Sequence, residues 1–396
     1  MSRTAWLVPL LCAAALAQAD DPAQLRDQAA ALVAQGKYAD AEPLLTRALA
    51  SQEKEFGPDA AGLIENIDLL GALYRAEGRN AEAQTVYARS LSIRQKTYGA
   101  DSSALIPDLK SLASLYAVLG QNAEAELSYL RVIAIREKSS GPDDLEMAKD
   151  CTDLAGFYIA QKRYAVAEPN LKRAVSIIEK KQGVLAPALL PVLDRLVTTY
   201  QKQQNYKEEE APLRRAISIL ESTRGPNHEE VAPYLDRLAM YYYQEKRYAD
   251  AEPLYERSLS IWEATLGPDS PELATTLDNL AVIYATLDQF PEAEPLYRRA
   301  LALRQKTTVQ SWNNLALVLE AKGDAAGAER LYQRAVTLAA QIPSLPGPAN
   351  VGEVQLLAVS LHNYASLLRR LKRVPEAVRM EARARALGRG RADGKL

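Results

Sequence analysis

The chain is poor in the residues that most often carry chemistry. Its 396 residues include two cysteines, two histidines, three phenylalanines and four methionines. If Cys12 leaves with the apolar N-terminal segment, Cys151 is alone and no intramolecular disulfide can form. Neither His228 nor His362 has a second metal-type ligand at a helical spacing or a companion cysteine, so no metal site is predicted.

Catalytic and nucleic-acid signatures are also missing. The sequence has no Gly-rich phosphate loop, no nucleophile elbow and no zinc motif, so we predict no enzyme and no cofactor. A formal net charge of −2 argues against general nucleic-acid binding. Cys151 takes an apolar position of the pattern described next, with no histidine near it in sequence, and is predicted to be an inert buried thiol.

Only the N-terminus carries a long apolar run. Arg3 precedes the apolar stretch 5–17, which is too short for an ordinary membrane span, and Ala17-Gln18-Ala19 is a small-x-small cleavage site. Residues 1–19 are therefore predicted to be a signal peptide. The mature chain would be exported, periplasmic or secreted, with no membrane span after cleavage.

What the sequence does contain is a repeat. Six glycines lie 42 residues apart, and each follows a long amphipathic segment: Gly57, Gly99, Gly141, Gly183, Gly225 and Gly267. A period of this length indicates a solenoid of stacked supersecondary units. In one unit, Leu277, Leu280, Ala281 and Tyr284 share a face of a first helix. Ala293, Tyr297 and Ala300 share a face of a second helix, and the small residues let the two helices approach.

Turn residues fit the same register. Gly36, Gly78 and Gly120 occupy one position between the two helices, where a left-handed residue ends the first helix. Three pairs at a spacing of three residues are interpreted as capping boxes: Asp143 with Glu146, Asn227 with Glu230, and Asp269 with Glu272. Pro43, Pro169, Pro253 and Pro295 lie near the start of the second helices, where slight distortion rather than a break is expected.

The period changes towards the C-terminus. Leu277-Asp-Asn-Leu-Ala returns as Trp312-Asn-Asn-Leu-Ala after 35 residues. The predicted organisation is a solenoid of about eight repeats over 20–340, a Pro- and Gly-rich loop at 341–355, a last helix pair at 356–387 and a disordered tail at 388–396.

These positions resemble the tetratricopeptide repeat. The small and large residues at 277, 280, 281, 284, 293, 297 and 300 match the family signature, and the 42-residue unit resembles its kinesin-light-chain type, here in an exported bacterial form. The resemblance implies an all-α, right-handed α-solenoid of about nine helix hairpins. It further implies that the first helices line a concave face that binds extended or helical peptide segments.

On this basis a peptide-binding groove is predicted from the first-helix positions that point away from the second helix. Its residues are Asp194, Arg195, Asp236, Arg237, Met240, Tyr243, Asp278, Asn279, Val282, Asn313, Asn314 and Leu317.

Two alternatives stay open within this groove. Asn313-Asn314 keeps an amide pair suited to a peptide backbone, since an amide both donates and accepts. Asp194-Arg195 and Asp236-Arg237 depart from it, and their charges either contact a ligand or pair as a solvated surface. Tyr243 with Met240 forms either an apolar pocket for a ligand anchor or packing against neighbouring helices.

The sequence therefore predicts a non-catalytic scaffold that binds a protein or peptide partner. The alternative is a self-associating module of the cell envelope. Exposed apolar residues on the end units, 23–49 or 356–387, would favour self-association. The basic segment from Arg369 to Arg391 either contacts an anionic surface or is a polar cap on the end of the stack.

Overall fold

The computed structural model describes residues 21–303, 309–339 and 351–389. The predicted signal peptide, most of the predicted Pro- and Gly-rich loop and all but two residues of the predicted tail lie outside these ranges. The described residues form helices and no strands, which confirms the all-α prediction. The chain divides into two compact units at Gln203/Gln204, between two helices that the sequence register assigns to one hairpin.

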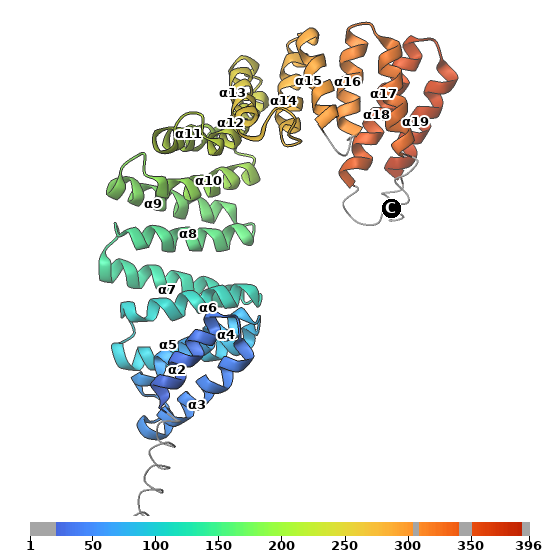
Figure 1. Cartoon of the computed structure of the whole chain (residues 1–396). Helices are drawn as coiled ribbons and strands as arrows, with labels where there is room; N and C mark the ends of the chain where they lie inside the picture. Colours follow the sequence, from blue (N-terminus) through green and yellow to red (C-terminus); the bar gives the residue numbers. More distant parts are fainter. Residues whose placement is uncertain (1–20, 304–308, 340–350, 390–396) are drawn as a thin grey trace, which may run out of the picture. The chain divides into compact units, whose positions relative to one another are not determined.

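The first unit is a stack of helix hairpins (Figure 1). Short 3-10 turns, η1 (Ala61–Leu63), η2 (Ser103–Leu105) and η3 (Pro187–Leu189), precede three of its helices. Its helices are α2 (Pro22–Ala34), α3 (Tyr38–Phe56), α4 (Ile64–Ala76), α5 (Asn80–Tyr98), α6 (Ile106–Val118), α7 (Asn122–Ser140), α8 (Leu145–Ala160), α9 (Tyr164–Gln182) and α10 (Leu190–Gln203).

The second unit repeats the arrangement, with 3-10 turns η4 (Tyr206–Glu208) and η5 (Glu229–Val231). Its helices are α11 (Glu210–Arg224), α12 (Ala232–Gln244), α13 (Tyr248–Leu266), α14 (Leu273–Thr286), α15 (Phe290–Leu303), α16 (Val309–Ala321), α17 (Ala325–Ala339), α18 (Val351–Arg370) and α19 (Val374–Arg389). Within each unit a second helix also packs against the first helix of the next hairpin, which makes the stack continuous.

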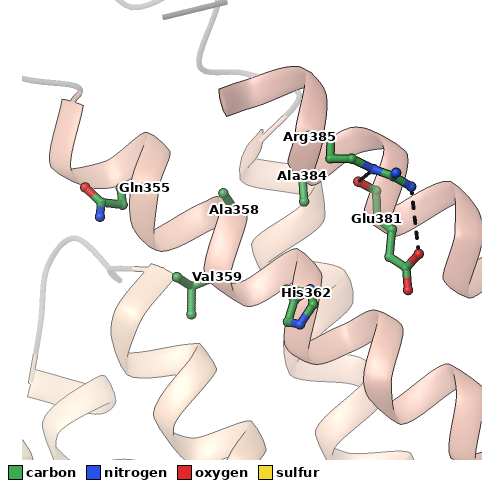
Figure 2. Close-up of a pocket in the computed structure, with 7 residues that line it drawn as sticks. All are labelled: Gln355, Ala358, Val359, His362, Glu381, Ala384 and Arg385. Carbon is green, nitrogen blue, oxygen red and sulfur yellow. Dashed lines mark hydrogen bonds and ion pairs between the residues drawn. The ribbon is translucent and has the colours of Figure 1, made fainter. Parts of the chain in front are cut away.

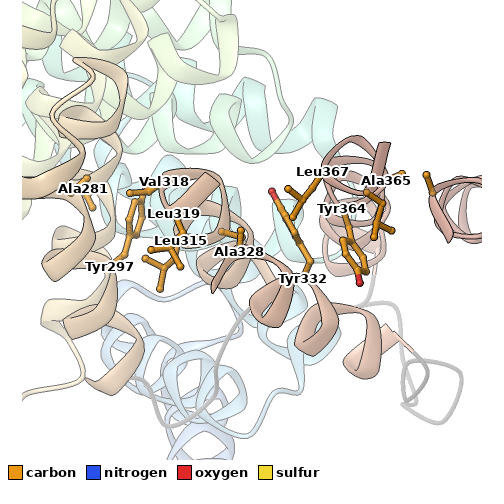
Figure 3. Packing of buried hydrophobic residues seen from close by; sticks show 14 residues of the cluster. Ala281, Tyr297, Leu315, Val318, Leu319, Ala328, Tyr332, Tyr364, Ala365 and Leu367 are labelled. Atoms are coloured by element: carbon orange, nitrogen blue, oxygen red, sulfur yellow. The ribbon is translucent and has the colours of Figure 1, made fainter. Parts of the chain in front are cut away.

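The core has the predicted alternation of small and large side chains. Ala281 and Ala293 are fully buried, and Tyr297 is 2% exposed beside them. Figure 3 shows how Tyr297, Tyr332 and Tyr364 lie along this core between successive hairpins. A buried tyrosine fills the space between two hairpins, and the alanines allow close contact within one.

The turn between the helices of a hairpin keeps one conformation with or without glycine. Gly36, Gly78 and Gly120 have φ between 73° and 76°, as predicted. Lys162 and Lys246 stand at the same register position with φ of 58°. These lysines adopt a left-handed conformation that an L side chain disfavours, because the hairpin packing on both sides holds the turn.

The predicted capping boxes are wrong by one residue. The side chain of Asp144, not Asp143, accepts from the backbone N–H of Glu146, and that of His228, not Asn227, accepts from Glu230. Asp144 has the extended backbone that a cap requires, and Asp143 instead pairs with Lys180 of α9. At the third site the hydroxyl of Ser270 donates to Glu272.

Two other details refine the sequence pattern. The prolines inside the second helices, Pro43, Pro169, Pro253 and Pro295, leave those helices uninterrupted. Helix α18 begins at Val351, inside the segment predicted as loop, and α19 continues to Arg389, two residues into the predicted tail. Residues 351–355 therefore extend the last hairpin.

Candidate binding face on the first helices

The predicted groove residues fall into two groups. Asp194 and Arg195 are on α10 in the first unit, whereas the other ten are on α12, α14 and α16 of the second. These three first helices are successive neighbours in their unit. The structure thus brings ten of the twelve residues onto one run of adjacent helices.

One column of this face is used inside the protein. The hydroxyl of Thr276 on α14 donates to Oδ2 of Asp236 on α12 at 3.0 Å, and Ser311 on α16 donates to Asp278 at 3.1 Å. Nδ2 of Asn363 on α18 donates to Oδ1 of Asn313 at 2.9 Å. Asp236, Asp278 and Asn313 therefore join each first helix to the next.

The carboxyl group of Asp236 is partly buried among hydrogen-bonding side chains. Burial raises its pKa, and hydrogen bonds from Ser258, Thr276 and Trp262 oppose that effect. In the first unit the same register position carries ion pairs. Lys110 of α6 contacts Asp150 of α8 at 3.0 Å and Asp153 at 2.7 Å. Hydroxyl and amide groups donate the bonds between first helices in the second unit, whereas Lys110 donates them in the first.

The neighbouring amide column also contacts the core. The side chain of Asn279 hydrogen-bonds the hydroxyl of Tyr255 on the preceding second helix, and that of Asn314 bonds Tyr297. Both asparagines are half-buried. An amide has two donor hydrogens and two lone pairs, so one bond to a tyrosine leaves capacity for a ligand backbone. The guanidinium of Arg237 lies 5.7 Å from the ring centroid of Tyr234.

The third column is apolar and exposed. Met240 on α12 is 36% exposed, Leu317 on α16 is 42% exposed, and Val282 on α14 is half-buried between them in register. We call these three side chains the apolar stripe. The same register position in the first unit holds Ala72, Ser114, Gly156 and Thr198. A stripe of larger apolar side chains is therefore a property of the second unit.

The three consecutive tyrosines on α12, Tyr241 to Tyr243, differ in burial. Tyr241 and Tyr242 are 6% and 1% exposed, with ring centroids 5.2 Å apart. Tyr243 is half-buried, and its ring centroid lies 5.6 Å from that of Tyr248. Two of the three rings are core, and Tyr243 retains an accessible edge close to Met240 in sequence.

The predicted groove residues of the first unit, Asp194 and Arg195, make contacts within the protein. Arg195 is exposed, and its guanidinium lies across Gly156 of α8 so closely that a Cβ there would overlap it. Asp194 has an interaction partner within the protein. Arg195 therefore covers the first helix α8 at Gly156, and Gly156 and Thr198 stand where the second unit has the apolar stripe.

Comparison with protein families identifies the repeat. The tetratricopeptide repeat model matches residues 22–96, 63–138, 145–222 and 229–306, and a second model of the same repeat matches 279–343. The chain is a tetratricopeptide repeat protein.

Solved structures show the same architecture. The C-terminal part of a tetratricopeptide repeat-containing protein of Cytophaga hutchinsonii has a TM-score of 0.54 at 15% identity, covering 73% of this chain and 99% of that one. A signal-transduction ATPase with a tetratricopeptide repeat sensor from Pyrococcus horikoshii has 0.51 at 13%, covering 89% and 54%.

Kinesin-light-chain-type repeats are also among the similar structures. A putative kinesin light chain from Podospora anserina has a TM-score of 0.46 at 23% identity, covering 51% of this chain and 95% of that one. No curated protein sequence matches the chain significantly. At these identities the similarities concern the fold.

The free thiol of Cys151 lies in the core of the tetratricopeptide repeats. Cys151 is fully buried, and burial raises its pKa to about 11, so the thiol is protonated at neutral pH, as the sequence predicted. Within the described ranges, no group of three or more histidine, cysteine or acidic side chains could hold a metal ion. No helix in that part of the chain is long and apolar enough to cross a membrane.

Sequence reasoning missed a recurrent bracket between successive repeats. The hydroxyl of Tyr74 donates to Glu42 at 2.9 Å, and Arg79 donates to the same carboxylate at 2.8 Å with its guanidinium 4.1 Å from the Tyr74 ring centroid. Hydrogen bonds from Arg79 hold the pKa of Glu42 below its usual range. The same bracket recurs as Glu126–Tyr158–Arg163, Glu210–Tyr242–Arg247 and Glu329–Tyr364–Arg373.

The residues of this bracket recur visibly in the sequence. A glutamate near the start of the second helix and an arginine after the hairpin turn recur in these four pairs of hairpins, and of the four glutamates only Glu42 lies in an Ala-Glu-Pro motif. The glutamate and the arginine are 37 residues apart in the first three brackets and 44 in the last, so their contact is visible only once successive hairpins are stacked.

Proposed function

We propose that the protein is a non-catalytic scaffold that binds a peptide segment of a partner protein along α12, α14 and α16. The main supporting observation is the apolar stripe on three adjacent first helices, in which Met240 and Leu317 are exposed and Val282 is half-buried. An exposed row of apolar side chains flanked by polar groups is typical of a protein-interaction surface.

The chemistry of the surrounding residues fits a peptide ligand. Methionine and leucine side chains accept apolar anchors of varied shape. Asn279 and Asn314 flank the stripe, and each amide retains hydrogen-bonding groups for a ligand backbone. Tyr243 adds a partly exposed ring, which is typical of binding hot spots.

The proposal includes export to a bacterial cell envelope. It rests on Arg3, the apolar stretch 5–17 and the Ala17-Gln18-Ala19 site. N-terminal sequencing of the protein isolated from its native cells tests this part. The expected mature sequence begins at Asp20, and a chain that retains its first residues in the cytoplasm would refute export.

Binding is tested by crosslinking capture from the native envelope fraction. We compare the wild type with Met240→Asp/Leu317→Asp and with Ser114→Asp/Thr198→Asp, which makes the same charge change at the same register in the first unit. The expected result is a partner lost only with the stripe variant. Equal partner lists for all three proteins would contradict the proposal and direct attention to other surfaces.

A further inference from the structure

Each hairpin of the second unit presents a face to the next first helix. At the sixth hairpin, Leu259 of α13 packs against Leu273, Ala274 and Leu277 of α14. The same helix α14 bonds Asp236 of α12 through Thr276. The surface between the two helices of one hairpin thus binds a helix, the first helix of the next hairpin. Its contacts can be seen at each such interface in this unit.

The last hairpin presents the same face without an occupant among the described residues. An open pocket of about 660 Å³ is lined by Ala358, Val359 and His362 of α18 and by Glu381, Ala384 and Arg385 of α19 (Figure 2). By register, His362 stands where Asp236 stands, Ala384 where Ser258 stands, and Arg385 where Leu259 stands. We call this pocket the end slot.

The end slot is apolar at its base and charged at its rim. Val359, which is 47% exposed, lines the slot together with Ala358 and Ala384. Arg385 lies along the rim with Glu381 at 3.9 Å, and Glu381 also accepts from Arg369 at 2.8 Å. The single acidic side chain of the slot is thus already paired with arginine.

We propose that the end slot binds an amphipathic α-helix of a partner protein, with acidic residues on the side that meets His362 and Arg385. A helix is indicated because the slot continues the interface that holds each preceding first helix. This site is separate from the apolar stripe and does not depend on the proposed function.

Charge favours an acidic occupant. From Arg369 to Leu387 the sequence has seven basic residues against two acidic ones. The first unit provides a precedent within this chain, because Lys110 has the register position of His362 and binds Asp150 and Asp153 of α8. An incoming helix with carboxylates at those two positions would place them beside His362 and Arg385.

A second copy of this chain fits less well. In a head-to-tail contact the slot would receive α2, which has one arginine and one aspartate and no exposed large apolar side chain. In a tail-to-tail contact two basic surfaces would meet, which is unfavourable. The end unit 356–387 does carry exposed apolar side chains, Val359, Val374 and Val378, which is the condition stated above as favouring self-association. A second copy is therefore the alternative that the test must exclude.

The probe is a fluorescein-labelled peptide of residues 144–160, the sequence of α8 with its cap, with Cys151 replaced by alanine and a hydrocarbon staple on its outer face. Binding to the mature protein is followed by fluorescence anisotropy. Val359→Glu is expected to weaken binding by about tenfold or more, and Val118→Glu, at a valine that is 67% exposed on α6, to leave it unchanged.

A charge exchange makes the test specific. Arg385→Glu should weaken binding of the acidic peptide and strengthen binding of the peptide with Asp150→Lys and Asp153→Lys. Equal affinities for Val359→Glu and Val118→Glu, or indifference to the charge exchange, would overturn the proposal. So would a concentration-dependent dimer in sedimentation that Val359→Glu dissolves, because the occupant would then be a second copy.

Discussion

Arg299 of α15 donates from Nη2 to the backbone carbonyl oxygen of Pro268, 31 residues earlier, at 2.7 Å, and its Nη1 pairs with Glu263. Arg89, Arg131 and Arg257 make the same bond to a carbonyl 31 residues earlier. One guanidinium thus ties the connector after a second helix to the next second helix. This clamp explains why arginine recurs at this position of the repeat.

The clamp is expected to contribute to stability. Arg299→Met should lower the free energy of unfolding by about 1 kcal/mol, because the carbonyl of Pro268 and the carboxylate of Glu263 lose a charged donor. Arg298→Met is the matched control, since Arg298 pairs with Glu294 of its own helix. Chemical denaturation measures both, and equal effects would contradict a role between repeats.

The hairpin turns offer a stabilising substitution. Lys246→Gly should raise the free energy of unfolding by about 0.5–1 kcal/mol, because glycine adopts the left-handed conformation without a Cβ penalty. Gly120→Ala is the opposite change at the same register position and should lower stability by about 1 kcal/mol. No atom lies within 4 Å of a Cβ built on Gly120, so its effect would come from the backbone alone.

Thermal unfolding compares these two variants with the wild type. A Lys246→Gly protein that melts below the wild type would show that the lysine side chain contributes more than its backbone costs.

The pH dependence of stability should report on Asp108. Burial raises its pKa to about 6, against hydrogen bonds from Arg94, and the residue is 1% exposed. The folded protein then binds more protons than the unfolded chain between about pH 4 and 6, so ionisation of Asp108 costs stability as pH rises through this range.

Asp108→Asn removes this titration. The free energy of unfolding of the variant minus that of the wild type should increase by about 1–3 kcal/mol from pH 4 to pH 7. Arg94 keeps Asp68 as a partner in the variant. Denaturation at several pH values measures the difference, and a difference that does not change with pH would refute the raised pKa.

The ring of Tyr87 packs closely against Gly71, which leads to a fourth prediction. A methyl group there would lie 2.7 Å from the ring of Tyr87, so Gly71→Ala should lower stability by about 1–3 kcal/mol. Gly62→Ala is the control, because its Cβ would meet no atom within 4 Å. Adding Tyr87→Leu should recover part of the loss by freeing the space, and no recovery would mean that the strain lies in the backbone.

Much of the fold could be read from spacing alone. The positions of Ala281, Tyr297 and their equivalents predicted which faces are buried, since a helical period fixes which side chains share a face. The family and the helix pairs follow from that regularity. The caps were misplaced because Asp143 and Asp144 are both suitable residues, and only the backbone path shows that Asp144 has the extended conformation.

The binding face was predicted only in part. Sequence position placed Asp236, Asp278 and Asn313 towards the groove, but their side chains bond the next first helix and so stabilise the stack. Met240 and Leu317 remain exposed, which a repeat pattern does not reveal. Whether a polar side chain meets solvent or a neighbour depends on the residue that the adjacent hairpin places opposite it.

The sequence by itself determined the repeat, the helices, the buried columns and the buried thiol, because these depend on contacts within a hairpin and on a strict period. The tertiary structure alone decided the division between α10 and α11, the Arg299 clamp, the hydrogen bonds between first helices and the end slot. The division falls inside one hairpin. The clamp and the hydrogen bonds join residues of different hairpins, and the end slot lies where that stacking stops among the described residues. Local periodicity carries no information about which side chains meet across that interface.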